Sequence, residues 1–303
     1  MRFVLTLFTF VALANAQTHP DPVLARMVPP GTVSILGVRM DQIKSTPMYE
    51  KMIAQRKLPD LDRFAEMTGF DPRRDVREML VASDGTQGQS VVVARGTFAK
   101  VTDMGKVKEW KHGIYLIHGD EKGGYCLLDN TTAAAGPLPG LYAALDHWYS
   151  HAPPATPGLL ARAESIPAAA QIWAISSGGF NIPGNITMRQ GGTDFAQIFR
   201  NVEQTVFWAD LRGGLDATLE GDVKTEDDAK NLGDAARGLI GIGRLSVPDN
   251  HRELFKVWDG FKVDQHARHL TITAKVPQDL IDQLVGLLQS GELRPGIPGH
   301  QQP

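Results

Sequence analysis

Cysteine is almost absent from the chain: Cys126 is the only one in 303 residues. No internal disulfide can form, so the fold must depend on an ordinary buried core, for which a chain of this length is ample. Cys126 lies in the apolar, strand-like run Gly124-Tyr125-Cys126-Leu127-Leu128. This setting predicts a buried, inert thiol rather than a reactive thiol or an intermolecular link.

Long apolar runs are also absent after the first twenty residues. The most apolar stretches, such as Val91 to Ala94, have the length of a strand. A membrane-spanning helix needs about 20 apolar residues in succession. We therefore expect no transmembrane segment in the mature chain.

The chain has no excess of charge of one sign. It carries 31 basic and 34 acidic residues, a net charge of −3. The basic pair Arg73-Arg74 is flanked by Asp71 and Asp75, which cancel it locally. Without a basic patch, the sequence gives no electrostatic argument for a nucleic-acid partner or for an anionic membrane surface.

The N-terminus has the three parts of a secretory signal peptide. Arg2 is followed by an apolar run from Phe3 to Ala14, and the run ends in Ala14-Asn15-Ala16. We predict cleavage between Ala16 and Gln17, and hence export to a periplasmic or extracellular location. A buried N-terminal helix is the alternative, which the lack of a polar face disfavours. Gln17 stands where a lipid-anchored bacterial protein would need a cysteine.

The histidine pairs do not form a convincing metal site. His147 and His151 have the spacing of zinc-protease ligands, but Trp148 stands where such an enzyme needs a glutamate. His266 and His269 flank the start of an expected strand, where a spacing of three points them to opposite faces. We predict no metal centre.

Two further motifs resemble enzyme signatures only in part. Ala174-Ile175-Ser176-Ser177-Gly178 lacks the first glycine of the serine-hydrolase pattern G-x-S-x-G. The glycines Gly238, Gly241 and Gly243 lie within or at the end of an amphipathic helical pattern, not between a strand and a helix. We therefore predict no catalytic residue and no cofactor.

Apolar periodicity and turn signals indicate strands and helices in the same order in both halves of the chain. In the first half we expect strands at 33–39, 76–83, 89–96, 114–118 and 125–128, and helices at 46–56, 60–68, 98–110 and 138–148. In the second half we expect strands at 171–176, 205–212, 215–223 and 269–276, and helices at 194–202, 226–240, 250–258 and 278–288. Gly213-Gly214 suits a two-residue type I′ hairpin turn.

This order predicts an α+β fold. It is typical of two tandem split β-α-β (ferredoxin-like) halves with a mainly antiparallel sheet and helices packed on one face. The expected organisation is a signal peptide at 1–16, a leader segment at 17–30, a first half at 31–152, a linker at 153–167, a second half at 168–289 and a flexible tail at 290–303.

The segment from Ser177 to Gly192 is long for a connection and carries five glycines. An irregular hairpin and a binding loop are both compatible with it. If it binds a ligand, the candidate contact residues are Phe180, Asn181, Asn185, Met188 and Arg189.

Four blocks give the chain a resemblance to a family of exported bacterial proteins of unknown function. They are Ser45-Thr46-Pro47-Met48-Tyr49, the run from Thr68 to Val76, the run from Val93 to Phe98, and Ala170-Gln171-Ile172-Trp173-Ala174. The resemblance covers most of the mature chain and implies export and a duplicated α+β build. The blocks are turns and strand ends rather than catalytic motifs, so the resemblance supplies no site residues.

From these observations we expect an exported protein of the cell envelope that binds a small ligand or a partner protein and catalyses no reaction. A secreted hydrolase with an unrecognised active site is the alternative, and a structural envelope component is the third possibility. A cleft with converging acid, base and nucleophile would favour the hydrolase. A large exposed apolar patch would favour the binding protein.

Overall fold

A computed structural model of the chain describes residues 20–51, 62, 65, 71–86, 88–98, 108–178, 189–190, 193–194, 201–245, 247 and 249–290. The expected signal peptide, its cleavage site at Ala16 and Gln17, and the tail from residue 291 lie outside the described residues. So does nearly all of the helix expected at 60–68.

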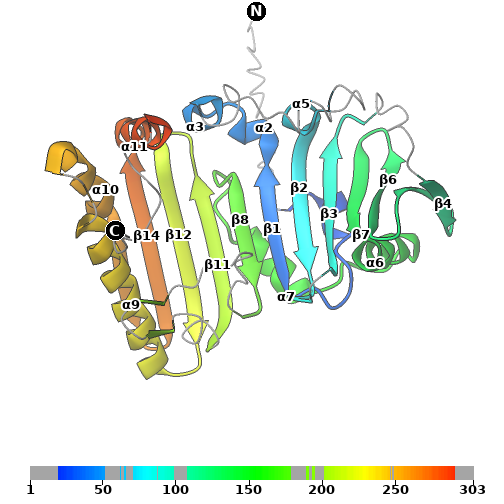
Figure 1. Cartoon of the computed structure of the whole chain (residues 1–303). Helices are drawn as coiled ribbons and strands as arrows, with labels where there is room; N and C mark the ends of the chain where they lie inside the picture. Colours follow the sequence, from blue (N-terminus) through cyan, green and yellow to red (C-terminus); the bar gives the residue numbers. More distant parts are fainter. Residues whose placement is uncertain are drawn as a thin grey trace, which may run out of the picture.

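The centre of the molecule is one twelve-stranded sheet in which every neighbouring pair is antiparallel, in the order β13-β14-β12-β11-β8-β1-β2-β3-β7-β6-β5-β4 (Figure 1). Its strands are β1 (Ser34–Arg39), β2 (Val76–Ser83), β3 (Ser90–Gly96), β4 (Lys108–His112), β5 (Tyr115–Gly119), β6 (Gly123–Asp129), β7 (Thr132–Pro137), β8 (Ile172–Ser176), β11 (Val202–Asp210), β12 (Gly214–Val223), β13 (Phe261–His266) and β14 (His269–Pro277). A separate two-stranded ladder joins β9 (Arg189–Gln190) to β10 (Thr193–Asp194).

The described helices lie near the two ends of this sheet and along one edge of it. They are α1 (Pro22–Ala25), α2 (Met40–Ile43), α3 (Pro47–Tyr49), α5 (Pro72–Asp75), α6 (Leu138–Tyr149), α7 (Pro157–Glu164), α9 (Glu226–Leu245), the 3₁₀ helix η2 (Asp249–Leu254), α10 (Phe255–Asp259) and α11 (Gln278–Ser290). Thr225 caps α9, because its Oγ1 accepts a hydrogen bond from the Asp228 backbone N–H at 3.0 Å.

The largest hydrophobic core lies on one face of the sheet, under α1, α6 and α7. Leu80 and Val93 project from β2 and β3 into this core, where they join Leu141 of α6 and Leu160 of α7. Trp173 of β8 belongs to the same core and is fully buried. The expected first and second halves therefore share one sheet and one core, because β1 pairs directly with β8.

Helices α9, α10 and α11 pack on the opposite face, at the other end of the sheet. Ile272 of β14 packs against the buried cluster that contains Leu232 of α9. A cross-strand row runs from Ile272 through Leu219 to Phe207 and on to Ala174. Ala174 alternates with Trp173, so this row faces away from the largest core. The expectation that all helices pack on one face is therefore wrong: each end of the sheet is covered on a different face.

The coarse prediction of an α+β fold with a large antiparallel sheet is confirmed, but tandem ferredoxin-like halves are not. In a split β-α-β unit, two strands that a helix connects are separated in the sheet by a third strand from elsewhere in the chain. Here β1, β2 and β3 instead lie side by side in chain order. The segment 153–167, expected to be a linker, contains α7, whose Leu159 and Ala163 are buried in the largest core.

Several strands were missed because they carry little apolar periodicity. The first three residues of β4 fall in the helix expected at 98–110, of which residues 99–107 lie outside the described residues. β13 has exposed polar or charged side chains at alternate positions. Both are edge strands, where charged side chains discourage pairing with other chains. β7 was missed because Thr132-Ala133-Ala134-Ala135 contains no large apolar residue.

The turn between β11 and β12 differs from the expected type I′ hairpin. That turn needs positive φ at both central residues, but φ is positive only at Gly214, where it is 120°. A Cβ on Gly214 would also overlap the Val276 carbonyl oxygen of β14. Gly214 is therefore required by close packing between strands as well as by its backbone conformation.

Candidate functional site

The middle of the sheet has an apolar face opposite the largest core, and Met40 of α2 packs against one part of it, in the buried cluster that contains Ala94 and Phe98. Its central row is set by the cross-strand register. Leu36 of β1 lies between Val81 of β2 and Ala174 of β8, and the row continues to Val92 of β3 and Phe207 of β11. All five side chains alternate with residues of the largest core, so they share the opposite face.

A second apolar row runs beside the first. Val38 of β1 pairs with Met79 of β2 and with Ile172 of β8, and the row extends through Ala94 to Ala133. We call these two rows the central apolar face; its residues are Leu36, Val38, Met79, Val81, Val92, Ala94, Ala133, Ile172, Ala174 and Phe207.

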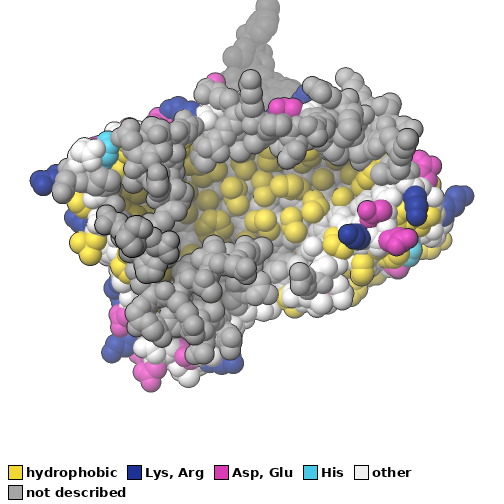
Figure 2. Space-filling model, viewed as in Figure 1, with side chains coloured by type: hydrophobic (Ala, Val, Ile, Leu, Met, Phe, Trp, Pro, Cys, Tyr) yellow, Lys and Arg dark blue, Asp and Glu magenta, His cyan; other side chains and the backbone are white. Residues whose placement is uncertain are grey.

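The central apolar face is accessible at its centre. Leu36 is 37% exposed, although β1 is an inner strand of a twelve-stranded sheet, whereas the adjacent Ile35 is 1% exposed in the core behind it. Val81, Val92 and Phe207 are partly buried. Figure 2 shows hydrophobic side chains gathered in a hollow over the central strands. Val38, Ala94 and Ala174 are each 9% exposed, so the accessible part of the face is centred on Leu36. An accessible apolar patch inside a sheet is a candidate binding surface.

The local sequence explains why both faces are apolar here. β2 contains Leu80-Val81-Ala82 and β3 contains Val91-Val92-Val93, so successive side chains on opposite faces are all apolar. In β12, by contrast, Leu215, Ala217 and Leu219 alternate with polar residues. Continuous apolar runs are typical of strands that are covered on both faces.

One edge of the central apolar face ends in a row of hydroxyl groups. Ser34 pairs with Ser83 and with Ser176, Ser83 pairs with Ser90, and Ser176 pairs with Thr205. These five residues come from five adjacent strands, β11, β8, β1, β2 and β3. We call them the hydroxyl row.

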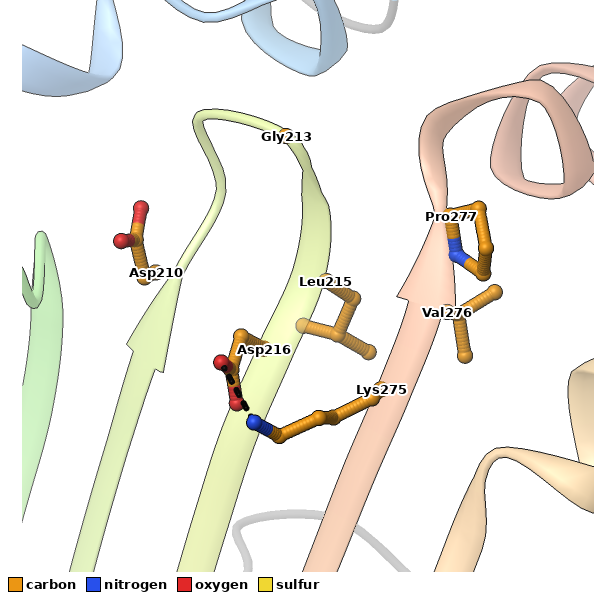
Figure 3. A pocket seen from close by; sticks show the side chains of 7 residues that line it. All are labelled: Asp210, Gly213, Leu215, Asp216, Lys275, Val276 and Pro277. Atoms are coloured by element: carbon orange, nitrogen blue, oxygen red, sulfur yellow. Dashed lines mark ion pairs between the residues drawn. The ribbon is translucent and has the colours of Figure 1, made fainter.

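A shallow pocket of about 390 Å³ lies elsewhere, where the β11–β12 turn meets the end of β14. It is lined by Asp210, Gly213, Leu215, Asp216, Lys275, Val276 and Pro277. Figure 3 shows Asp216 and Lys275 extending toward each other from β12 and β14, and the Oδ2–Nζ distance is 3.3 Å.

The charged groups of this pocket are held by one another and by the adjacent turn. Hydrogen bonds from the Arg212 guanidinium lower the pKa of Asp210 to about 2. A carboxylate with so low a pKa is a poor general base near neutral pH. The pocket is therefore better explained as a turn stabilised by ion pairs and hydrogen bonds than as a catalytic centre.

The structure describes little of the predicted binding loop. Phe180, Asn181, Asn185 and Met188 lie outside the described residues, and Arg189 lies in β9, which pairs with β10. The other residues singled out in the sequence are described. Cys126 is fully buried, and burial raises the pKa of its thiol to about 11. Ser176 is flanked across the sheet by Ser34 and Thr205 rather than by a general base.

The histidine pairs are arranged differently from the expectation. α6 ends at Tyr149, so His151 lies beyond the helix that carries the buried His147. His266 and His269 pair across the β13–β14 hairpin, so they share a face, and their expected placement on opposite faces is wrong. The His269 Nδ1 atom lies 2.9 Å from Asp222 Oδ1. Within the described ranges, no three potential ligand side chains come together to hold a metal ion.

No described helix is long and apolar enough to cross a membrane. No protein-family model matches the chain, and no curated protein matches it. The chain is similar in structure to crystal form III of TP0453, with a TM-score of 0.50, 9% identity, and coverage of 89% of this chain and 98% of that one. Crystal form I of TP0453 gives a TM-score of 0.48 and 10% identity over 89% and 97% of the two chains. At this level of identity the likeness concerns the fold alone.

Proposed function

We propose that this chain is an exported, non-enzymatic binding protein of the cell envelope that holds an apolar ligand on the central apolar face. The main observation in support of the proposal is that Leu36, at the centre of the first apolar row and next to the second, is exposed. The proposed export rests on the signal-peptide pattern of residues 1–16. We also propose that the two halves of the chain arose by internal duplication.

The face suits a small apolar ligand better than catalysis. Its ten side chains are aliphatic, aromatic or thioether groups, and none of them can transfer a proton or attack a substrate. Burying apolar area stabilises a complex by about 25 cal/mol per Å². A flexible hydrocarbon ligand could cover several strands, because Leu36, Val81 and Val92 lie side by side on three adjacent strands.

The proposal is tested with a neutral apolar fluorescent probe, 1-N-phenylnaphthylamine, titrated into the mature full-length protein. We expect saturable binding with a fluorescence increase. Leu36→Asp should weaken binding at least tenfold, because it places a carboxylate at the centre of the apolar rows. Ile114→Asp is the matched control: Ile114 is 70% exposed in the turn between β4 and β5, so the same change should leave binding intact.

A milder variant protects the test against misfolding. The double substitution Val81→Thr and Val92→Thr keeps the branched shape that strands favour, and it adds two hydroxyls to the face. It should weaken probe binding without changing the circular dichroism spectrum. If the wild-type protein binds no probe, or if Leu36→Asp and the double variant bind it as tightly as wild type, the proposed function is wrong.

A further inference from the structure

The hydroxyl row lies on the same face as Leu36 and at the end of the two apolar rows. Ser34 is two residues before Leu36 in β1, and Ser83 is two residues after Val81 in β2, so each pair shares a face. Ser176 has the same relation to Ala174 in β8. A ligand that lies across the apolar rows therefore meets five hydroxyls at one of their edges.

The hydroxyl row is not an ordinary water-facing strand end. Ser176 is 4% exposed and Thr205 is 6% exposed, whereas the apolar Leu36 is 37% exposed. On a strand end that faces water, polar side chains are expected to be more exposed than their apolar neighbours. For Ser176 and Thr205 this order is reversed, whereas Ser34, Ser83 and Ser90 are partly buried.

Part of the hydroxyl row lacks internal hydrogen bonds. Thr205 Oγ1 donates to the Gly178 carbonyl oxygen at 2.8 Å, and Ser83 Oγ accepts from the Gly85 backbone N–H at 3.1 Å. The hydroxyls of Ser34, Ser90 and Ser176 have no partner within the described part of the chain. Ser34 and Ser90 are partly buried, and none of the three hydroxyls is among the fully buried polar atoms that lack a partner, so each is accessible to a hydrogen bond from a group outside the protein.

The row also carries no formal charge. Neither the hydroxyl row nor the central apolar face contains a lysine or arginine that could pair with a carboxylate or phosphate. The nearest charged residue along the chain is Asp84, which follows Ser83 and would repel an anion. Hydroxyls both donate and accept hydrogen bonds, so they suit an uncharged group that does the same.

We infer that the ligand is an uncharged amphiphile, whose hydrocarbon chain lies on the central apolar face and whose hydroxylated head group binds the hydroxyl row. This inference rests on the function proposed above. A monoacylglycerol has the required chemistry: one apolar chain and a neutral head with two hydroxyls and an ester.

The test is competition against bound 1-N-phenylnaphthylamine by monolaurin and by laurate, each below its critical micelle concentration. The two competitors have the same chain and differ in the charge of the head group. In the wild-type protein, monolaurin should displace the probe at a concentration at least tenfold lower than laurate. The triple variant Ser34→Ala, Ser83→Ala and Ser176→Ala should lose most of this preference while it binds the probe as wild type does.

The matched control removes hydroxyls from the other face of the sheet. Thr271 and Thr273 of β14 alternate with Leu270 and Ile272, which pack under α9, so they face away from the hydroxyl row. Thr271→Val with Thr273→Val should leave the preference unchanged. If the triple variant is unstable, Ser176→Ala alone should still reduce the preference.

The two possible failures are distinguishable. If the wild-type protein and the triple variant bind the probe but show the same ratio of monolaurin to laurate affinity, the inference about the head group is wrong and the apolar site stands. A wild-type preference for laurate also overturns it. If the wild-type protein does not bind the probe, the proposed function and the inference both fail.

Discussion

Gly37 and Trp173 face each other across the β1–β8 pair, and the indole of Trp173 occupies the space where a Cβ on Gly37 would lie. Trp173 is fully buried in the largest core. The pair joins the strand that opens the first half to the strand that opens the second. A glycine in a central strand weakens it in isolation, so this one is explained by the close approach of the indole.

Gly37→Ala should destabilise the protein by about 2–3 kcal/mol, because a methyl group would overlap a rigid, buried ring that has no room to move. Chemical denaturation of wild type and variant measures the change. Gly221→Ala in β12 is the control, since the nearest atoms to its added Cβ are 4.0 Å away. The explanation fails if both alanine variants have the same midpoint of unfolding.

The two edge hairpins of the sheet provide a paired test of turn conformation. The β4–β5 turn has Gly113 at φ 58°, and the β13–β14 turn has Ala267 at φ 49°. Alanine is strained in this left-handed region and glycine is not. We expect Ala267→Gly to stabilise the protein by about 0.5–1 kcal/mol and Gly113→Ala to destabilise it by a similar amount. Thermal unfolding measures the stability of both variants. If both substitutions change the stability in the same direction, the left-handed conformation of these two turn residues does not explain it.

Glu78 should make the stability depend on pH. Its side chain is 7% exposed, and burial raises its pKa, partly offset by the hydrogen bond from the Asp21 backbone N–H at 3.2 Å and by the charge of Arg39. Because the folded-state pKa is raised, this group contributes stability that is fully present below about pH 4.5, its ordinary pKa. That contribution is lost as the pH rises through the raised value.

Glu78→Gln removes this titration and keeps an oxygen that can accept from Asp21. The free energy of unfolding of the variant, relative to wild type, should therefore increase as the pH rises from 4 to 7. Urea denaturation at several pH values measures it. Glu121→Gln, at a position whose side chain is 93% exposed, should show no such trend. A difference that falls with pH would contradict the assigned burial effect.

Cys126 should be inert in the native protein. Its side chain is fully buried and burial raises its thiol pKa to about 11, so little thiolate is present at neutral pH. A disulfide-exchange reagent should label it only after denaturation. Cys126→Ala should cost about 1 kcal/mol through a small packing defect. Rapid labelling of the native protein, or loss of a dimer in the variant, would instead indicate a functional thiol.

Elements with strong local signals were predictable from the sequence. The alternation in β12 and the apolar stripe of α9 each follow from side chains within one segment. The hydroxyl of Thr225 at the start of α9 and the turn-forming pair Asp84-Gly85 between β2 and β3 are local signals of the same kind. These features need no knowledge of the rest of the fold.

The arrangement of the sheet was not predictable in the same way. Which face each helix covers depends on contacts between distant segments, such as those of α6 with β3. The β1–β8 pairing joins residues about 140 positions apart, and no local pattern encodes it. The order of the strands within the sheet, with β1 beside β8 and β3 beside β7, therefore could not be predicted from local patterns.

The candidate site was missed because its residues become neighbours only through the register. Ser34, Ser83 and Ser176 are unremarkable in the sequence, and only cross-strand pairing places them in one row. One signal was available. Val91-Val92-Val93 is apolar at successive positions, which indicates a strand that must be covered on both faces.

The last prediction concerns whether the two expected halves unfold together. The largest core contains Leu80 and Val93 from the first half and Trp173 and Val206 from the second. Since this core is shared, destabilising one half should lower the protection of both. Gly214→Ala is a suitable perturbation, because an added Cβ would overlap the Val276 carbonyl oxygen at the far end of the sheet.

Hydrogen exchange in the full-length protein measures the outcome. Gly214→Ala should reduce protection in β12 and β14 and, through the shared core, also in β1 and β2. Gly213→Ala is the control: φ is not positive at Gly213, and no atom lies within 4 Å of its added Cβ. It should change little in any strand. If Gly214→Ala leaves β1 and β2 as protected as in wild type, residues 31–152 form a unit that is stable without the second half, and the boundary expected at 153–167 separates two independent domains despite the continuous sheet.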